Sequence, residues 1–100
     1  MGGLLGAIFE FDWDDQKSAE NIRKHKVSFD EAATIFDDAL LMTEADWVHS
    51  YEEDRYVSIG FSSQNRTLVV VYTERVRTIR LISARVPTSR EKQSYENDNS

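Results

Sequence analysis

Hydrophobic and polar residues alternate with two different periods along the chain, and the change of period separates a helical part from a sheet part. Residues 14–26 are mostly polar and begin with aspartates, which suits a helix N-terminus. Residues 28–38 have the spacing of an amphipathic helix, and Ser28 with Glu31 predicts a capping box at its start. The side chains expected to form its apolar stripe are Phe29, Ala32, Ala33 and Phe36, with Ile35 at the margin.

From residue 39 onward the period changes to two, which is typical of strands. The predicted strands are residues 7–13, before the helices, and then 39–44, 55–63, 66–74 and 78–86. Because residues 66–74 are apolar on both faces, we expect this strand at the centre of the sheet. After Pro87 a last helix is predicted, where Thr88 and Glu91 form a second capping box.

This order of elements, β-α-α-β-β-β-β-α, predicts a small single domain of the α+β class. We expect the domain to span residues 1–96 and residues 97–100 to form a disordered tail. The two N-terminal helices are expected to pack on one face of an antiparallel sheet. The residues predicted to lie in the core are Phe29, Ala33, Phe36, Ile59, Val69, Val71 and Leu81.

Composition excludes several classes of protein. The chain has 100 residues, 40% of them hydrophobic, which indicates a globular domain rather than a disordered segment. It contains no cysteine, so neither a disulfide framework nor a thiolate metal site is expected, and a reducing compartment fits. No apolar run approaches the roughly 20 residues that cross a membrane. We therefore expect a cytoplasmic protein without a membrane partner.

The net charge of −6 argues against simple, non-specific binding of nucleic acid. The charge is uneven, however, because residues 75–100 carry six basic and three acidic residues. A basic edge on an acidic body is the expected result.

A cluster of basic residues surrounds His25 in the stretch NIRKHKVSF at residues 21–29. Cations at a helix C-terminus complement the helix dipole, which is a purely structural explanation. A phosphate site with a titratable imidazole beside it is the functional alternative. The sequence leaves both open for Lys24 and His25. Because the two histidines are far apart in the sequence, no metal site is expected.

A second basic cluster lies at the end of the predicted meander, where four arginines occur within eleven residues: Arg75, Arg77, Arg80 and Arg85. Each could pair structurally with an acid such as Glu74, or the set could clamp an anion, since a guanidinium matches phosphate geometry. Strict alternation along the last strand places Ile79, Leu81, Ser83 and Arg85 on one face, and Arg80, Ile82 and Ala84 on the other. The two tryptophans, Trp13 and Trp47, are expected to be packing residues.

Several blocks of the sequence, spread in order over residues 9–96, resemble the BrnT family of bacterial toxins. The most specific are KH-VSF-EA--IF-D, HS--E-R, IG-S, TER and ISAR. The resemblance implies a RelE-like ribonuclease fold and a toxin of a type II toxin–antitoxin pair that cleaves RNA without a metal or other cofactor. It also implies a hetero-oligomer with a DNA-binding antitoxin of the BrnA kind. Many relatives have glycine at the position of Lys26, so this lysine must adopt a conformation that glycine takes easily.

Metal-free RNA cleavage needs activation of a 2′-hydroxyl, stabilisation of a phosphorane-like charge and protonation of the leaving oxygen. The resemblance and this chemistry together suggest two sets of residues. The predicted catalytic residues are Lys24, His25, Arg75 and Arg85, and the predicted substrate-binding residues are His49, Arg55, Glu74 and Arg80. The alternative function is a non-catalytic module of the same fold that binds a protein or RNA.

Overall fold

The sheet of the protein has five strands in the order β1-β5-β4-β3-β2. The computed structural model describes residues 9–49 and 53–98. The strands are β1 (Glu10–Asp12), β2 (Met42–Ala45), β3 (Arg55–Phe61), β4 (Thr67–Arg75) and β5 (Thr78–Arg85). Strand β4 is central, as its apolar sequence predicts. All neighbours are antiparallel except β1, which runs parallel to β5, so the sheet is mixed rather than wholly antiparallel.

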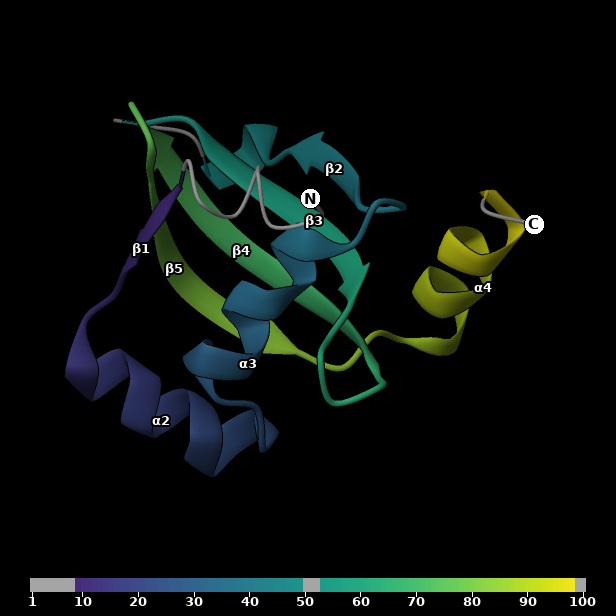
Figure 1. Cartoon of the computed structure of the whole chain (residues 1–100), viewed down its shortest axis with the longest axis horizontal. Coiled ribbons are helices and arrows are strands. Elements are labelled where there is room, and N and C mark those ends of the chain that lie inside the picture. The colour runs from purple at the N-terminus through teal and green to yellow at the C-terminus, as the bar shows by residue number, and fades with distance from the viewer. Residues whose placement is uncertain (1–8, 50–52, 99–100) are drawn as a thin grey trace.

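Two helices lie on one side of this sheet and a third follows the last strand (Figure 1). The helical segments are α2 (Asp15–His25), α3 (Phe29–Ala33), η1 (Thr34–Asp37), η2 (Trp47–His49) and α4 (Ser89–Asp98). The α+β class and the order of elements are therefore as predicted. Helix α4 continues to Asp98, so the first two residues of the tail predicted at 97–100 belong to the helix. Residues 7, 8, 99 and 100, which carry the ends of the predicted first strand and the tail, lie outside the described residues.

The main core lies between the sheet and the helices α2 and α3. Its fully buried centre on the helix side consists of Phe29, Ala32 and Ile35. These residues are spaced by three because the helix tightens after Ala33 into the 3₁₀ turn η1, in which residues i and i+3 share one side. Ile35 therefore points inward, whereas Phe36 is only half-buried. The prediction had assumed an unbroken α-helix.

Of the residues predicted for the core, Phe29, Val69 and Leu81 are buried. The remaining four, Ala33, Phe36, Ile59 and Val71, are half-buried. The apolar face of β3 that includes Ile59 is not the face that meets the helices, because the polar neighbour Ser58 is fully buried there and bonds to Tyr72 of the core.

The first predicted capping box forms only in part. Ser28 Oγ accepts a hydrogen bond from the Glu31 backbone N–H at 3.0 Å, so Ser28 is the N-cap. The Glu31 carboxylate instead accepts hydrogen bonds from Arg66 and from Ser62 Oγ. Glu31 is 3% exposed, and its ion pair with Arg66 connects α3 to the turn between β3 and β4.

Helix α2 meets the sheet through a polar side chain. Asn21 is buried, and its side-chain amide donates to the carbonyl of Ala84 at 2.7 Å and accepts from the Ala84 N–H at 3.0 Å. These bonds satisfy the backbone N–H and C=O of Ala84, in a part of β5 that the short edge strand β1 does not reach. Ile22 of the same helix is 47% exposed. The helix ends at Lys26 with φ 59° and ψ 33°, the left-handed conformation expected there.

Candidate functional site

A β-bulge in β5 decides which side chains share the face of the sheet opposite α2 and α3, here called the open face. Leu81 pairs with Tyr72 and Ser83 pairs with Val71, which leaves Ile82 as the extra residue. An extra residue shifts the alternation of all the side chains that follow it. Ala84 consequently joins Leu81 in the buried core, and Arg85 moves to the open face.

Strict alternation had placed Arg80 and Arg85 on opposite faces of the last strand, and this prediction is wrong. Arg80 pairs with Thr73, the neighbour of the core residue Tyr72, so Arg80 also lies on the open face. The bulge therefore brings both arginines to one surface.

Neighbouring strands add further basic residues to this surface. Arg55, Thr73, Arg80 and Asp12 form one transverse row through the paired strands β3, β4, β5 and β1. Arg75 lies two residues further along β4 on the same face, opposite Thr78. The open face thus carries guanidinium groups from three strands, namely those of Arg55, Arg75, Arg80 and Arg85.

Three of these arginines bind carboxylates of the same chain. Arg75 pairs with Glu53, Arg80 pairs with Asp12, and Arg85 holds both oxygens of Glu91 at 2.7 and 2.9 Å. The partner that the sequence suggested, Glu74, is not used in these pairs. Glu74 pairs with Ile79 of the core, so its side chain points to the helix side of the sheet.

These ion pairs stabilise the charged forms of the acids. The hydrogen bonds from Arg85 are the main reason that the pKa of Glu91 falls to about 2. Arg75 likewise lowers the pKa of Glu53. Both carboxylates are therefore negative at neutral pH and occupy positions that another anion could take.

Lys24 and His25 lie at the end of α2, where that helix borders the bulge in β5. They line a cavity of about 210 Å³ together with Ile82 and Ser83 of the strand and with Lys17, Glu20 and Asn21 of the helix. Along β5 this cavity lies between the positions of Arg80 and Arg85. The structure therefore brings the helix-end cluster and the β5 arginines to the same edge of the sheet.

The other predicted residue, His49, lies in η2 beside the start of β3. Its ring nitrogen Nδ1 is 3.0 Å from an oxygen of Asp46, whose backbone N–H donates to the carbonyl of Arg55. His49 is exposed at this end of the sheet, and its role as a substrate-binding residue stays a prediction.

Two features of the site were missed or misjudged in the sequence. Thr73 lies in the middle of the row of open-face residues, and its position as a polar residue in the apolar strand 66–74 was the available signal. Trp47 is 83% exposed and therefore is not a packing residue. Trp13 does pack as expected, edge-on against Phe29 with ring centroids 5.9 Å apart.

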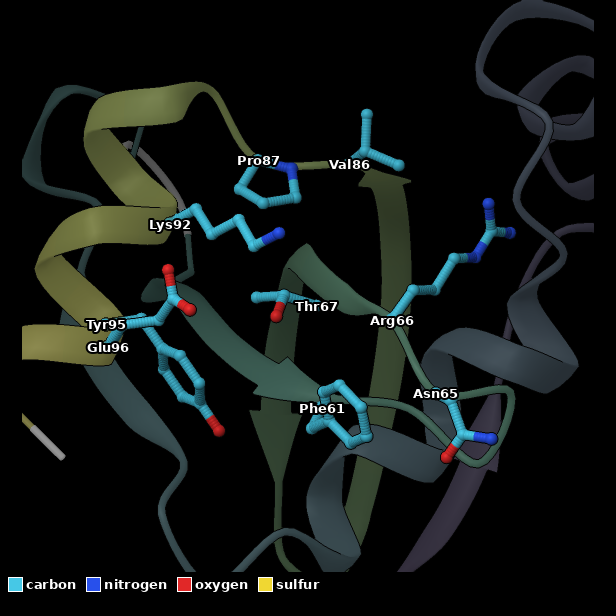
Figure 2. Close-up of a pocket in the computed structure, with 9 residues that line it drawn as sticks. All are labelled: Phe61, Asn65, Arg66, Thr67, Val86, Pro87, Lys92, Tyr95 and Glu96. Atoms are coloured by element: carbon cyan, nitrogen blue, oxygen red, sulfur yellow. The ribbon is translucent and has the colours of Figure 1, made fainter. Parts of the chain in front are cut away.

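A separate hollow of about 460 Å³ lies between α4 and the ends of β3 and β4 (Figure 2). Lys92 and Tyr95 of α4 face Phe61, Thr67 and Pro87 across it. None of the predicted catalytic residues lines this hollow. Of its two cations, Lys92 extends into the hollow and Arg66 is bound to Glu31, but no histidine lines it, so we do not assign the active site here.

Among residues 9–49 and 53–98, no three histidine, aspartate or glutamate side chains are grouped as a metal site requires. In the same part of the chain no helix has the length and apolar character needed to span a membrane.

A sheet with two helices on one face and arginines on the other defines a small α+β domain suited to binding a polyanion. Over residues 13–91 the chain matches the family model of the BrnT ribonuclease toxin of type II toxin–antitoxin systems. The chain therefore belongs to the BrnT family.

Comparison with solved structures supports the fold. The 1.1 Å crystal structure of the Brucella abortus ribonuclease toxin BrnT is similar, with a TM-score of 0.58 and 19% sequence identity. The match covers 81% of this chain and 99% of that one. Among curated protein sequences, none matches the chain.

Proposed function

We propose that this member of the family is an endoribonuclease that cuts RNA without a metal, and that the reaction takes place on the open face along β5. The observation that carries the proposal is the bulge at Ile82, which sets Arg80 and Arg85 on one surface with the His25 cavity between them at the strand edge. A surface of this kind supplies cations for a phosphate and one group that can move a proton.

The chemistry assigns a role to each part of this surface. His25 takes the proton from a 2′-hydroxyl or returns one to the leaving oxygen, since imidazole exchanges protons near neutral pH. The 2′-oxygen attacks phosphorus as the bond to the 5′-oxygen breaks, leaving a 2′,3′-cyclic phosphate and a free 5′-hydroxyl. Lys24, Arg75, Arg80 and Arg85 supply positive charge along the RNA. The cations nearest the cut stabilise the negative charge that builds up on its phosphoryl oxygens, and the others hold neighbouring phosphates, because Arg75 and the partner of Arg85, Val69, lie at opposite ends of β4.

Family membership implies an antitoxin partner. We propose that a DNA-binding antitoxin covers the open face and that its acidic side chains take the places now held by Asp12, Glu53 and Glu91. The complex acts in the cytoplasm, where RNA is available. An interface that blocks this face is of ordinary size if it buries about 1,600 Å² in total.

The proposed activity is tested by incubating the purified protein with single-stranded RNA in excess EDTA. We expect cleavage to continue, because the proposed groups are all side chains of this chain, and we expect products ending in a cyclic phosphate or 3′-phosphate. Cleavage that stops in EDTA and returns with a divalent cation would contradict the metal-free mechanism.

The second candidate is a binding module without catalysis. It is favoured by one observation, namely that three open-face arginines already hold carboxylates and so accept acidic partners. The same assay separates the two functions, because a binding module retains RNA or the antitoxin but yields no product ends.

A further inference from the structure

Thr73 carries a buried hydroxyl without a hydrogen-bond partner. The residue is 6% exposed, and its Oγ1 is the one buried side-chain oxygen or nitrogen of the described chain that makes no hydrogen bond. Most buried hydroxyls are satisfied, because an unpaired one loses its bonds to water and gains nothing in return. An exception in the middle of a charged surface therefore needs an explanation.

The cross-strand neighbours of this hydroxyl are two arginines. Arg55 on β3 and Arg80 on β5 are the direct cross-strand partners of Thr73, so their side chains emerge on either side of it from the same face. A hydroxyl donor between two guanidinium groups is a set of donors suited to a tetrahedral oxyanion.

Carboxylates of the chain already occupy this region. Asp12 pairs with Arg80, and Glu53 pairs with Arg75. The pKa of Glu53 is lowered mainly by Arg75, with smaller contributions from Thr73 and Arg80, so its carboxylate lies close to the row. It nevertheless makes no hydrogen bond of normal geometry to the Thr73 hydroxyl. These acids occupy the positions of an anionic ligand. They do not, however, accept a hydrogen bond from the Thr73 hydroxyl, as such a ligand would.

We propose that Thr73, Arg55 and Arg80 form a phosphate-binding subsite for the backbone of RNA. The proposal rests on the proposed function, because the phosphate is taken to belong to the RNA that the protein cuts. The Thr73 hydroxyl donates a hydrogen bond to a non-bridging oxygen, and the two arginines neutralise the charge. Glu53 and Asp12 move aside as the phosphate enters.

The decisive variant is Thr73→Val, which keeps the shape of the side chain and removes the hydroxyl. Because that hydroxyl makes no hydrogen bond in the free protein, the melting temperature is expected to stay the same or rise. The affinity for a 2′-O-methyl RNA 12-mer, which cannot be cut, is expected to fall about tenfold through the loss of one charge-assisted hydrogen bond.

Two control variants accompany it. Thr73→Ser keeps a hydroxyl and is expected to bind this RNA within about threefold of the wild type. Thr67→Val removes another hydroxyl of β4, one that is 8% exposed and lies at the opposite end of the strand, and is expected to leave affinity unchanged.

The outcomes distinguish this inference from the proposed function. If the wild type cuts RNA and Thr73→Val binds the 12-mer as tightly as the wild type, the subsite is overturned and the ribonuclease stands. If the wild type neither cuts nor binds RNA, the proposed function fails, and titration with inorganic phosphate decides the subsite. A shift of the Thr73 amide signal that Thr73→Val abolishes supports the subsite, and no shift overturns it. Preference for a poly-glutamate peptide over RNA would also overturn the phosphate assignment.

Discussion

Replacing His25 with alanine is expected to slow RNA cleavage by about 10²- to 10⁴-fold, the range for removing a group that transfers a proton. His25 is exposed at the end of α2 and lines the cavity beside the bulge, so a substrate that crosses β5 can reach its ring. Single-turnover rates on a short RNA measure the effect. Free imidazole added to the variant is expected to restore part of the lost rate.

The same variant is expected to fold normally, because no buried side chain is removed. Circular dichroism and a thermal melt check this before the kinetics are interpreted. The substitution Ile22→Ala, one turn earlier on α2, is a matched control, since this side chain lies outside the cavity. Full activity in a folded His25→Ala protein would return His25 to a structural role at the end of α2.

The substitution Arg66→Ala is expected to destabilise the fold by about 3 kcal/mol, which is the low end for breaking a buried ion pair, since Arg66 itself is partly exposed. Among the described residues it leaves the buried Glu31 carboxylate with Ser62 alone as a hydrogen-bond donor. Urea denaturation at pH 7 measures the loss. The substitution Arg23→Ala, which removes an exposed arginine of α2, is expected to change stability by less than about 0.5 kcal/mol.

The pH dependence gives a second test of this ion pair. Arg66 lowers the pKa of Glu31, so the pair stabilises the folded state fully above the ordinary carboxyl range near 4.5. This contribution is lost as the pH falls through the lowered value. Without Arg66, burial favours the neutral acid, so the variant is expected to recover relative to the wild type on acidification. A deficit that stays constant from pH 7 to pH 4 would mean that Glu31 is not the cause.

The sequence was sufficient to predict the order of elements because each signal was local. The period of apolar residues, the cap at Ser28 and the all-apolar strand that became β4 depend on neighbours within a few positions. The second capping box, at the start of α4, is also a local signal. It forms completely, because Thr88 and Glu91 exchange hydrogen bonds at 2.8 and 3.2 Å. Family membership was predicted as well, from motifs distributed along the whole chain.

The arrangement of the site could not be predicted in the same way, because it depends on contacts between distant segments. The bulge at Ile82 exists only in the pairing of β5 with β4, and nothing in the alternation of β5 alone reveals it. The ion pair between Arg66 and Glu31 joins residues that lie 35 positions apart in the sequence. Asp12 reaches Arg80 only because β1 lies beside β5. Each of these contacts redirects a charged side chain that local rules had placed elsewhere.

The central claim is that the open face arranged by the bulge is the surface on which RNA is cut. The most direct measurement compares single-turnover cleavage by Arg80→Ala and Arg23→Ala, two variants that each lose one arginine. Arg80 lies on the open face, whereas Arg23 is an exposed residue of α2 that does not line the His25 cavity. We predict that Arg80→Ala is slower than the wild type by about 10²-fold, the effect of losing one donor to the transition state, and that Arg23→Ala stays within about twofold. Equal rates in the two variants would contradict the claim and place the reaction on another surface.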